Sequence, residues 1–316
     1  MRVLALTALA CLMSIPAATA GSRRCGDDTD GRGRTVPCDC GDVLVSSRTL
    51  GPHDPITQHA CPGTGLLVDV AADRPAATLD LGGQTLVGQG RGIGIQVLGG
   101  GTGGLLLVGP GAIRGFDLGV LARGSELARA SDVIASDNAT DGFSLGGTGY
   151  AITRCEASRN GRDGFTLRGS GFLVEGNHAA QNRRFGFAVA GESAALGGTL
   201  GNEAAGNGRD GLVVRGRGHE LVHPVATGNA GTGLRARFSA GRIAGAVAAD
   251  NRRDGLRGGG RDLDVTDSEA RDNGGAGIDV RGARVHDGGG NRARGNGHAT
   301  AAARRRAGCQ VGSSCR

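Results

Sequence analysis

The residues best placed to do chemistry in this 316-residue sequence are arginines that recur at fixed places after a repeated glycine. Apolar residues alternate with them at the two-residue period of a strand, so we expect the arginines to point outward. They are Arg168, Arg215, Arg235, Arg237, Arg257 and Arg281. Guanidinium groups pair with carboxylate and sulfate. If the repeats lie in register, these arginines form a positive strip that binds an anionic polymer; the alternative is a surface that only keeps the protein soluble.

A second set of charged residues precedes the repeated glycine in four repeats. These are Asp141, Asp163, Asp210 and Asp254. Carboxylates in such a row suit calcium binding or acid–base catalysis. The Asp-Gly pair is also ordinary turn chemistry, and the other repeats replace the aspartate freely. We therefore interpret these four as turn residues.

The remaining acidic group contains Asp262, Asp264 and Asp267, with His286 nearby in sequence. Its oxygen atoms are weak candidates for Ca²⁺ ligands, and a solvated outer loop is the favoured interpretation. We expect no cofactor, with Ca²⁺ possible if the protein is catalytic.

All of these residues belong to one repeat, in which alanine is followed three residues later by asparagine, and four residues after that by glycine and an apolar residue. The asparagines are Asn138, Asn160, Asn182, Asn207, Asn229, Asn251, Asn273 and Asn296. The steps between them are 22, 22, 25, 22, 22, 22 and 23 residues. Such units are too short for helical pairs and predict one coil of short parallel strands per repeat. Stacked asparagines would form an amide ladder, and the 25-residue step predicts a three-residue bulge near residues 191–198.

This pattern resembles the right-handed parallel β-helix repeat family, the pectate-lyase-like superfamily. The stretches 79–86, 92–95 and 111–119 look like the opening coils of its secreted bacterial members. The resemblance covers about residues 40–298. It implies an all-β, single-stranded right-handed solenoid of about 10 coils with repeats of about 22 residues. It also implies that the strip lies on the face along which family members bind polysaccharide.

The ends of the chain differ from the repeats. Residues 1–20 have the charged start, apolar run and Ala-Thr-Ala ending of a signal peptide cleaved after Ala20. We expect an amino-terminal cap over residues 21–65, the β-helix over 66–298 and a basic tail over 299–316. No other stretch could span a membrane, so these features predict a secreted or periplasmic protein.

Cysteines flank the repeats, as expected for disulfides in an exported chain. We pair Cys25 with Cys38, Cys40 with Cys61, and Cys309 with Cys315, although the sequence does not prove this connectivity. A metal site is the rival at residues 38–40, but its spacing is not that of a zinc site. Cys155 lies within the repeats and is expected to be a buried free thiol.

The sequence therefore predicts an exported polysaccharide-binding or envelope-associated protein without strong catalysis, whose partner is an anionic polysaccharide. The alternative is a polysaccharide lyase or C5-epimerase acting on uronates. The resemblance alone also admits a periplasmic metal-maturation factor. Nucleic acid is not an expected partner, because aromatic residues, which would stack on bases, make up only 3% of the chain. The oligomeric state is left open.

Overall fold

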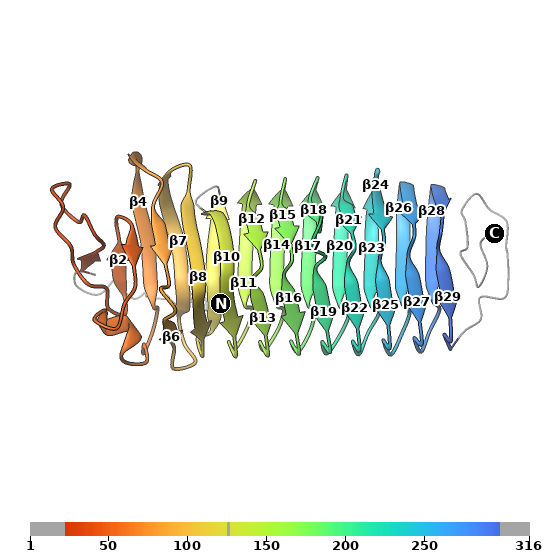
Figure 1. Cartoon of the computed structure of the whole chain (residues 1–316), viewed down its shortest axis with the longest axis horizontal. Coiled ribbons are helices and arrows are strands. Elements are labelled where there is room, and N and C mark those ends of the chain that lie inside the picture. The colour runs from red at the N-terminus through yellow and green to blue at the C-terminus, as the bar shows by residue number, and fades with distance from the viewer. Residues whose placement is uncertain (1–22, 125–126, 298–316) are drawn as a thin grey trace, which may run out of the picture.

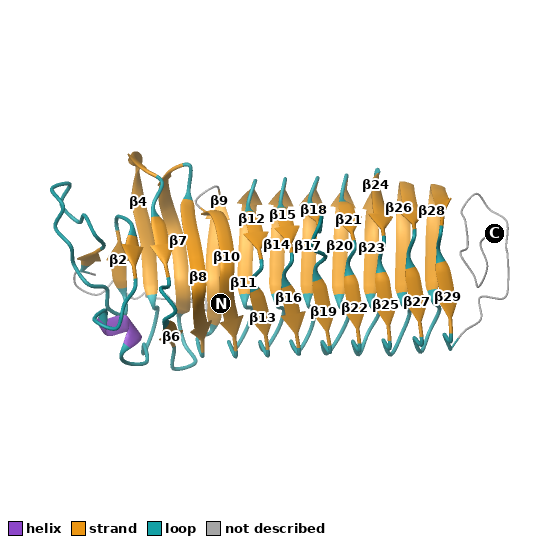
Figure 2. Cartoon of the chain, viewed as in Figure 1, coloured by secondary structure: helices purple, strands orange, loops and turns teal. Residues whose placement is uncertain are grey.

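The computed structural model describes residues 23–124 and 127–297. In them the chain winds into one elongated solenoid of parallel strands, and the single helical turn is the 3₁₀ segment η1 (Pro55–Thr57) (Figures 1 and 2). This confirms the predicted all-β, right-handed parallel β-helix. There are about 12 coils instead of about 10, because parallel pairing already begins at residues 24–25, before the predicted start at residue 66.

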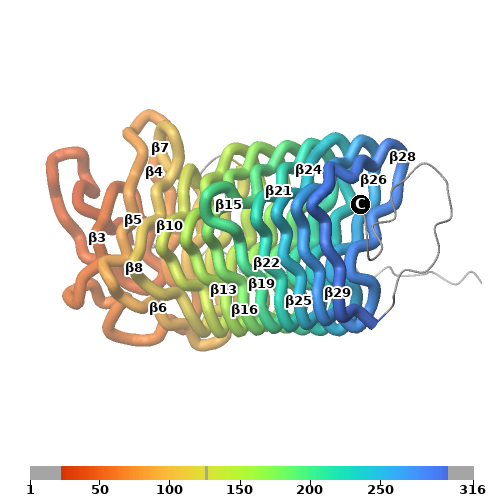
Figure 3. The backbone as a smooth tube through the Cα atoms, turned by 45° about the vertical axis from the view of Figure 1, so that its right-hand side comes forward, coloured from red at the N-terminus to blue at the C-terminus, as the bar shows by residue number. Residues whose placement is uncertain are grey.

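The strands form three columns along the solenoid, and the coils stack one behind another (Figure 3). The first column, called face A, carries the predicted arginine strip. Its strands are β1 (Arg24–Cys25), β2 (Asp42–Leu44), β4 (Leu66–Pro75), β7 (Ile93–Thr102), β9 (Leu118–Gly124), β11 (Phe143–Thr148), β14 (Phe165–Ser170), β17 (Phe187–Glu192), β20 (Leu212–Arg217), β23 (Leu234–Ser239) and the first parts of β26 (Leu256–Thr266) and β28 (Ile278–Gly289).

The other two columns complete each coil. Face B contains β3 (Arg48–Thr49), β5 (Thr78–Asp80), the first parts of β8 (Leu105–Arg114) and β10 (Leu127–Ser136), β12 (Ala151–Thr153), β15 (Leu173–Glu175), β18 (Ala195–Leu196), β21 (Glu220–Val222), β24 (Gly241–Ala244) and the later parts of β26 and β28. Face C contains β6 (Thr85–Val87), the later parts of β8 and β10, β13 (Glu156–Ser158), β16 (His178–Ala180), β19 (Glu203–Ala205), β22 (Val225–Thr227), β25 (Val247–Ala249), β27 (Glu269–Arg271) and β29 (Arg292–Arg294).

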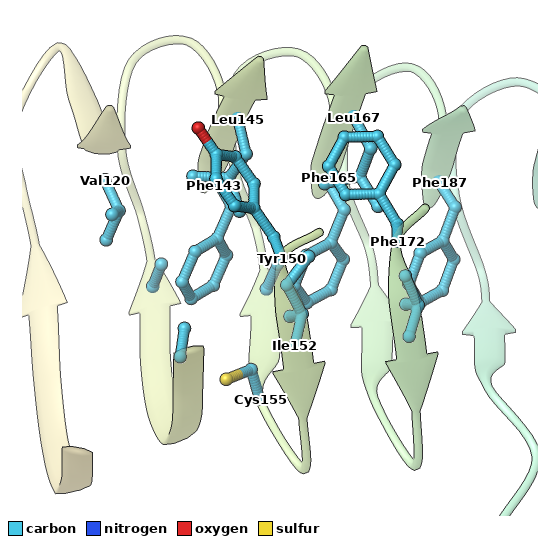
Figure 4. Close-up of a cluster of buried hydrophobic side chains, with 14 of the residues drawn as sticks. Val120, Phe143, Leu145, Tyr150, Ile152, Cys155, Phe165, Leu167, Phe172 and Phe187 are labelled. Atoms are coloured by element: carbon cyan, nitrogen blue, oxygen red, sulfur yellow. The ribbon is translucent and has the colours of Figure 1, made fainter. Parts of the chain in front are cut away.

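Equivalent residues of successive repeats lie directly over one another, which fills the narrow core. Phe143, Phe165 and Phe187 are paired in register and fully buried. Their rings stack with centroids 4.9 and 4.8 Å apart (Figure 4). These separations match the interstrand spacing, so each ring rests on the next without a gap.

The repeated asparagines form the predicted amide ladder inside the turn that leads to face A. The side-chain amide of Asn160 donates to the Oδ1 of Asn182 at 3.0 Å, and the same contact recurs along the column, as from Asn229 to Asn251. The same side-chain amide also donates to a backbone carbonyl, as that of Asn160 does to Ala135 at 3.0 Å. The ladder therefore satisfies polar groups that the turn would otherwise bury unpaired.

The longer repeat keeps this register by confining its extra residues to one loop. Leu196 on β18 still pairs with Val174 at a step of 22 residues, whereas Asn202 already stands 25 residues after Asn177. The bulge therefore lies at residues 197–201, which overlaps the predicted span of 191–198 only at residues 197 and 198. The residues before it stay in place because Ala195 and Leu196 belong to face B.

The predicted disulfides Cys25–Cys38 and Cys40–Cys61 are both present, and they link residues of the region predicted as the cap. Bonds of this kind persist in oxidising compartments, which agrees with export. Cys155 is buried and free, as predicted. The predicted signal peptide, the basic tail and the Cys309–Cys315 pair lie outside the described residues. Within the described part of the chain, no helix is long and apolar enough to cross a membrane.

Candidate functional site

The six predicted arginines, here called the strand arginines, fall into two parallel rows on face A. The first row contains Arg235 on β23, which pairs in register with Arg257 on β26. Arg257 in turn pairs in register with Asp279 on β28. The second row contains Arg168, Arg215, Arg237 and Arg281. The predicted strip therefore exists as two rows of side chains on one face.

Between Arg123 and Arg215 the second row alternates arginine with small residues, and Arg237 follows Arg215 directly. Arg123 aligns with Gly146, Gly146 with Arg168, and Arg168 with Ala190, which in turn aligns with Arg215. Neighbouring coils are separated by roughly 4.8 Å, so Arg123, Arg168 and Arg215 repeat at roughly 9.6 Å. Arg123 was missed from the sequence because its coil lacks the repeated asparagine that served as the reference point.

The strand arginines divide into paired and unpaired groups. Arg235 contacts Asp210 at 2.6 Å, Arg257 contacts Asp254 at 3.2 Å and Arg281 contacts Asp279 at 2.7 Å. Among the described residues, no ion pair or side-chain hydrogen bond involves the other three, Arg168, Arg215 and Arg237, and all three are exposed. The unpaired group has its full hydrogen-bonding capacity available to a ligand.

A further row of arginines, which we call the turn arginines, lies on the turns before face A. They are Arg162, Arg184, Arg209 and Arg253, each two residues after a ladder asparagine. Backbone hydrogen bonds of 2.8 Å from Arg184 to Arg162 and from Arg209 to Arg184 stack them coil on coil. Sequence reasoning missed this row because it considered only strand positions, although the fixed offset from asparagine was visible.

Two hollows open between the turn arginines and the strand arginines. One, of ≈140 Å³, is bordered by four arginines, Arg162, Arg168, Arg184 and Arg215, and by Asp163. The other, of ≈420 Å³, is bordered by Arg209, Arg235, Arg253 and Asp210. Both are bordered by Phe185, so they lie end to end along the solenoid. We call the pair the arginine groove; seven arginines and two carboxylates line it.

The floor of the first hollow is made by small outward residues of β17. Ala188 aligns with Thr166 and Val213, and Ala190 aligns with Arg168 and Arg215. A coil with two alanines between longer neighbours leaves a notch one coil wide. Exposed guanidinium groups flank this notch, which places positive charge beside an apolar floor.

The carboxylates of the turns serve the fold. Asp141 accepts the backbone N–H of Asp163 at 3.1 Å, and Asp163 accepts that of Phe185 at 3.0 Å. Asp210 and Asp254 bind the next coil in the same way. These contacts agree with the interpretation as turn residues. Burial raises the pKa of the Asp163 carboxyl, with nearby Asp141 adding to the effect and the Phe185 N–H opposing it.

The weak calcium candidates border neither hollow of the groove and lie on and beside β26. Asp262 forms an ion pair with Arg284, and Asp264 lies 3.4 Å from His286. Asp267 has a left-handed backbone, with φ of 49°. Within the described residues, the group whose possible ligand atoms converge is instead Asp39, Cys40 and His59. Calcium binding at the aspartates stays a prediction.

No protein-family model matches this sequence, and a search of curated proteins finds no relative. Solved structures of similar shape include a mutant of the periplasmic alginate epimerase AlgG, with 13% identity, 77% of this chain and 84% of that chain covered, and a TM-score of 0.43. The AlgE4 A-module of the Azotobacter vinelandii mannuronan C-5 epimerase has 14% identity, with 81% of this chain and 85% of that chain covered, and a TM-score of 0.39. The Dettilon tailspike protein has 14% identity, with 82% of this chain and 57% of that chain covered, and a TM-score of 0.40. Likeness at this level concerns the fold alone.

Proposed function

We propose that this protein is an exported, non-catalytic β-helix protein that binds an anionic polysaccharide along the arginine groove. The observation that carries the proposal is the row of unpaired Arg168, Arg215 and Arg237 along face A. Arg168 and Arg215 border the first hollow together with the turn arginines Arg162 and Arg184. A single small anion would need only one such cluster. A row that continues over several coils suits a polymer whose charges also recur.

The physical basis is the combination of forked donors and a shallow floor. Each unpaired guanidinium can bind a carboxylate or sulfate through two parallel hydrogen bonds. The alanines of the notch leave room for a sugar ring between the side chains. Because the site is open to solvent, its affinity depends on many weak contacts and falls with added salt.

The non-catalytic form is supported by the state of the carboxylates in the groove. Asp210 is held by Arg235 and by the Thr232 N–H, so it is not available as a base. The alternative, a lyase or C5-epimerase, is favoured by one observation: the buried Asp163, with its raised pKa, borders the first hollow. Both activities would use the same anionic polymer.

Binding of labelled alginate, polygalacturonate and heparin at low ionic strength tests the proposal. Replacing both Arg168 and Arg215 by alanine should weaken binding about tenfold, which corresponds to roughly 1.4 kcal/mol. The matched control replaces Arg114 and Arg292, two exposed arginines on face C, by alanine. Equal binding by both variants would overturn the proposal. Formation of unsaturated uronate, or epimerisation seen by NMR, would establish the catalytic alternative instead.

A further inference from the structure

Four residues with metal-binding atoms meet near the surface of the predicted amino-terminal cap, where His59 is exposed, Asp39 and Cys40 are partly buried and Cys61 is buried. His59 Nε2 lies 3.2 Å from Asp39 Oδ1 and 3.7 Å from Cys40 Sγ. The ligand atoms of these three residues all lie within 4.8 Å of one another. The fourth residue, Cys61, joins them through its disulfide with Cys40.

The spacing of these atoms resembles that of a tetrahedral metal shell. With metal–ligand bonds of 2.0 to 2.3 Å, neighbouring ligand atoms of a tetrahedral zinc site are roughly 3.3 to 3.8 Å apart. The two separations from His59 are close to this range before any metal is bound. Two thiolates, one imidazole and one carboxylate form a donor set that suits Zn²⁺ and related soft cations.

We propose that Asp39, Cys40, His59 and Cys61 form a redox-gated site for one Zn²⁺-like cation, which opens when the Cys40–Cys61 disulfide is reduced. A dithiol supplies two electrons and two protons, breaks the S–S bond and itself becomes a cyclic disulfide. The two protein thiols then lose their protons as they bind the cation. Reoxidation reforms the S–S bond and expels the metal.

Hydrogen bonds also hold the backbone around these residues, in addition to the disulfide. The Cys61 N–H donates to the Val87 carbonyl at 2.7 Å, and the Gly41 N–H, next to Cys40, donates to the Gly65 carbonyl at 2.7 Å. The Asp39 N–H donates to the Asp42 carboxylate at 2.8 Å. Reduction therefore frees the two sulfur atoms while the coils hold the four residues together.

Access also distinguishes this disulfide from the other one. Cys25, Cys38 and Cys61 are all fully buried, whereas Cys40 is only partly buried and lies beside the exposed His59, so Cys40 Sγ is the sulfur open to attack. Attack by a dithiol thiolate requires a reachable sulfur. We expect the Cys40–Cys61 bond to be reduced first, which leaves the second disulfide in place to secure the cap.

Co²⁺ titration of the mature chain, reduced with dithiothreitol under nitrogen and freed of reagent, tests the site. One Co²⁺ per chain should bind and show thiolate charge-transfer and tetrahedral ligand-field bands, and Zn²⁺ should displace it. His59→Ala should weaken Co²⁺ binding at least about tenfold, or roughly 1.4 kcal/mol. His53→Ala, an exposed histidine outside the group, should leave it unchanged.

Two double variants locate the ligands, with circular dichroism confirming that each is folded. Replacing Cys40 and Cys61 by serine should abolish the thiolate bands, and replacing Cys25 and Cys38 by serine should preserve them. The proposal is overturned if the oxidised chain binds Co²⁺ equally well, if the Cys40–Cys61 variant keeps the bands, or if the reduced chain binds no Co²⁺.

Discussion

The side-chain amide of Asn182 donates to the Oδ1 of Asn207 at 3.0 Å, the same distance as from Asn160 to Asn182, although three more residues separate the first pair. The extra residues leave the coil as a loop, and the ladder passes unchanged. The interior of the solenoid therefore fixes the position of each coil, while the loops absorb differences in length. This separation explains how insertions on the surface leave the arginine rows in register.

The ladder leads to a first prediction, for Asn182→Ala. This change removes the acceptor of the Asn160 N–H and amide and the donor to the Ala157 carbonyl. Each buried group left unpaired costs about 1–3 kcal/mol, so we expect a loss of about 3 kcal/mol in the free energy of unfolding. Urea denaturation measures it. Arg183→Ala, at the exposed neighbouring position, is the control, and similar midpoints for the two variants would contradict the structural role of the ladder.

A second prediction concerns Cys155, a thiol sealed in the core. Burial raises its pKa to about 12, so almost no thiolate exists at neutral pH, and the sulfur is also out of reach. We expect no reaction with a disulfide reagent in the native protein and rapid reaction after unfolding. Cys155→Ala should lower the thiol count of the unfolded chain by one. If the native protein does react with the reagent and Cys155→Ala abolishes that reaction, the coil around Cys155 opens readily.

A third prediction follows from the buried His219. Its Nδ1 accepts the Ala194 N–H at 3.2 Å and its Nε2 lies 3.1 Å from the Arg215 carbonyl oxygen, so the ring is neutral with its proton on Nε2. Burial lowers its pKa below the ordinary 6.5. Between the folded-state pKa and 6.5 the unfolded chain binds more protons, so stability falls as the pH drops through this window.

The measurement is the unfolding free energy between pH 7 and pH 5, for the natural chain and for His219→Gln. As the pH falls, the free energy of unfolding of the natural chain should decrease by up to roughly 1.4 kcal/mol per pH unit more than that of the variant. Glutamine keeps a donor and an acceptor without titrating, which makes it the matched comparison. Parallel curves for the two proteins would show that His219 does not couple protonation to folding.

The sequence could predict the positions of residues that recur at fixed offsets, but it could not predict which side chains pair between neighbouring repeats. Phe165, Asn182 and the strand arginines stand at fixed offsets, and translational stacking converts an offset into a column. The same logic would have revealed the turn arginines, because Arg184 stands at a fixed offset too. It could not reveal pairing: Arg235 and Arg237 are two residues apart in one strand, yet the first is held by Asp210 from the previous coil and the second is unpaired.

The cap shows a second limit. Asp39 and His59 are 20 positions apart in a region without repeats, so no period predicted that they would meet. The sequence left the cysteine connectivity open, and the described disulfides confirm two of the three predicted pairs. Bringing the histidine to the same sulfur depends on the turn after η1, whose course only the coordinates provide.

The last prediction tests the groove by adding charge. Gly146 and Ala190 interrupt the row of Arg123, Arg168 and Arg215. The backbone at Gly146 leaves room for a side chain, since the nearest atom to an added Cβ is the Arg168 carbonyl oxygen at 3.7 Å. Because Arg237 follows Arg215 on the next coil, replacing both small residues by arginine would place a guanidinium on six successive coils.

If a polyanion lies along this row, the double variant should bind heparin about tenfold more tightly at low salt. The slope of log K against log salt should steepen by about one per added arginine that meets a charge, because each contact releases a counterion. Ala180→Arg with Ala205→Arg, at outward positions of face C, adds the same charge elsewhere. An equal gain in this control would mean that net charge governs binding; a gain confined to face A would place the polymer over Ala190.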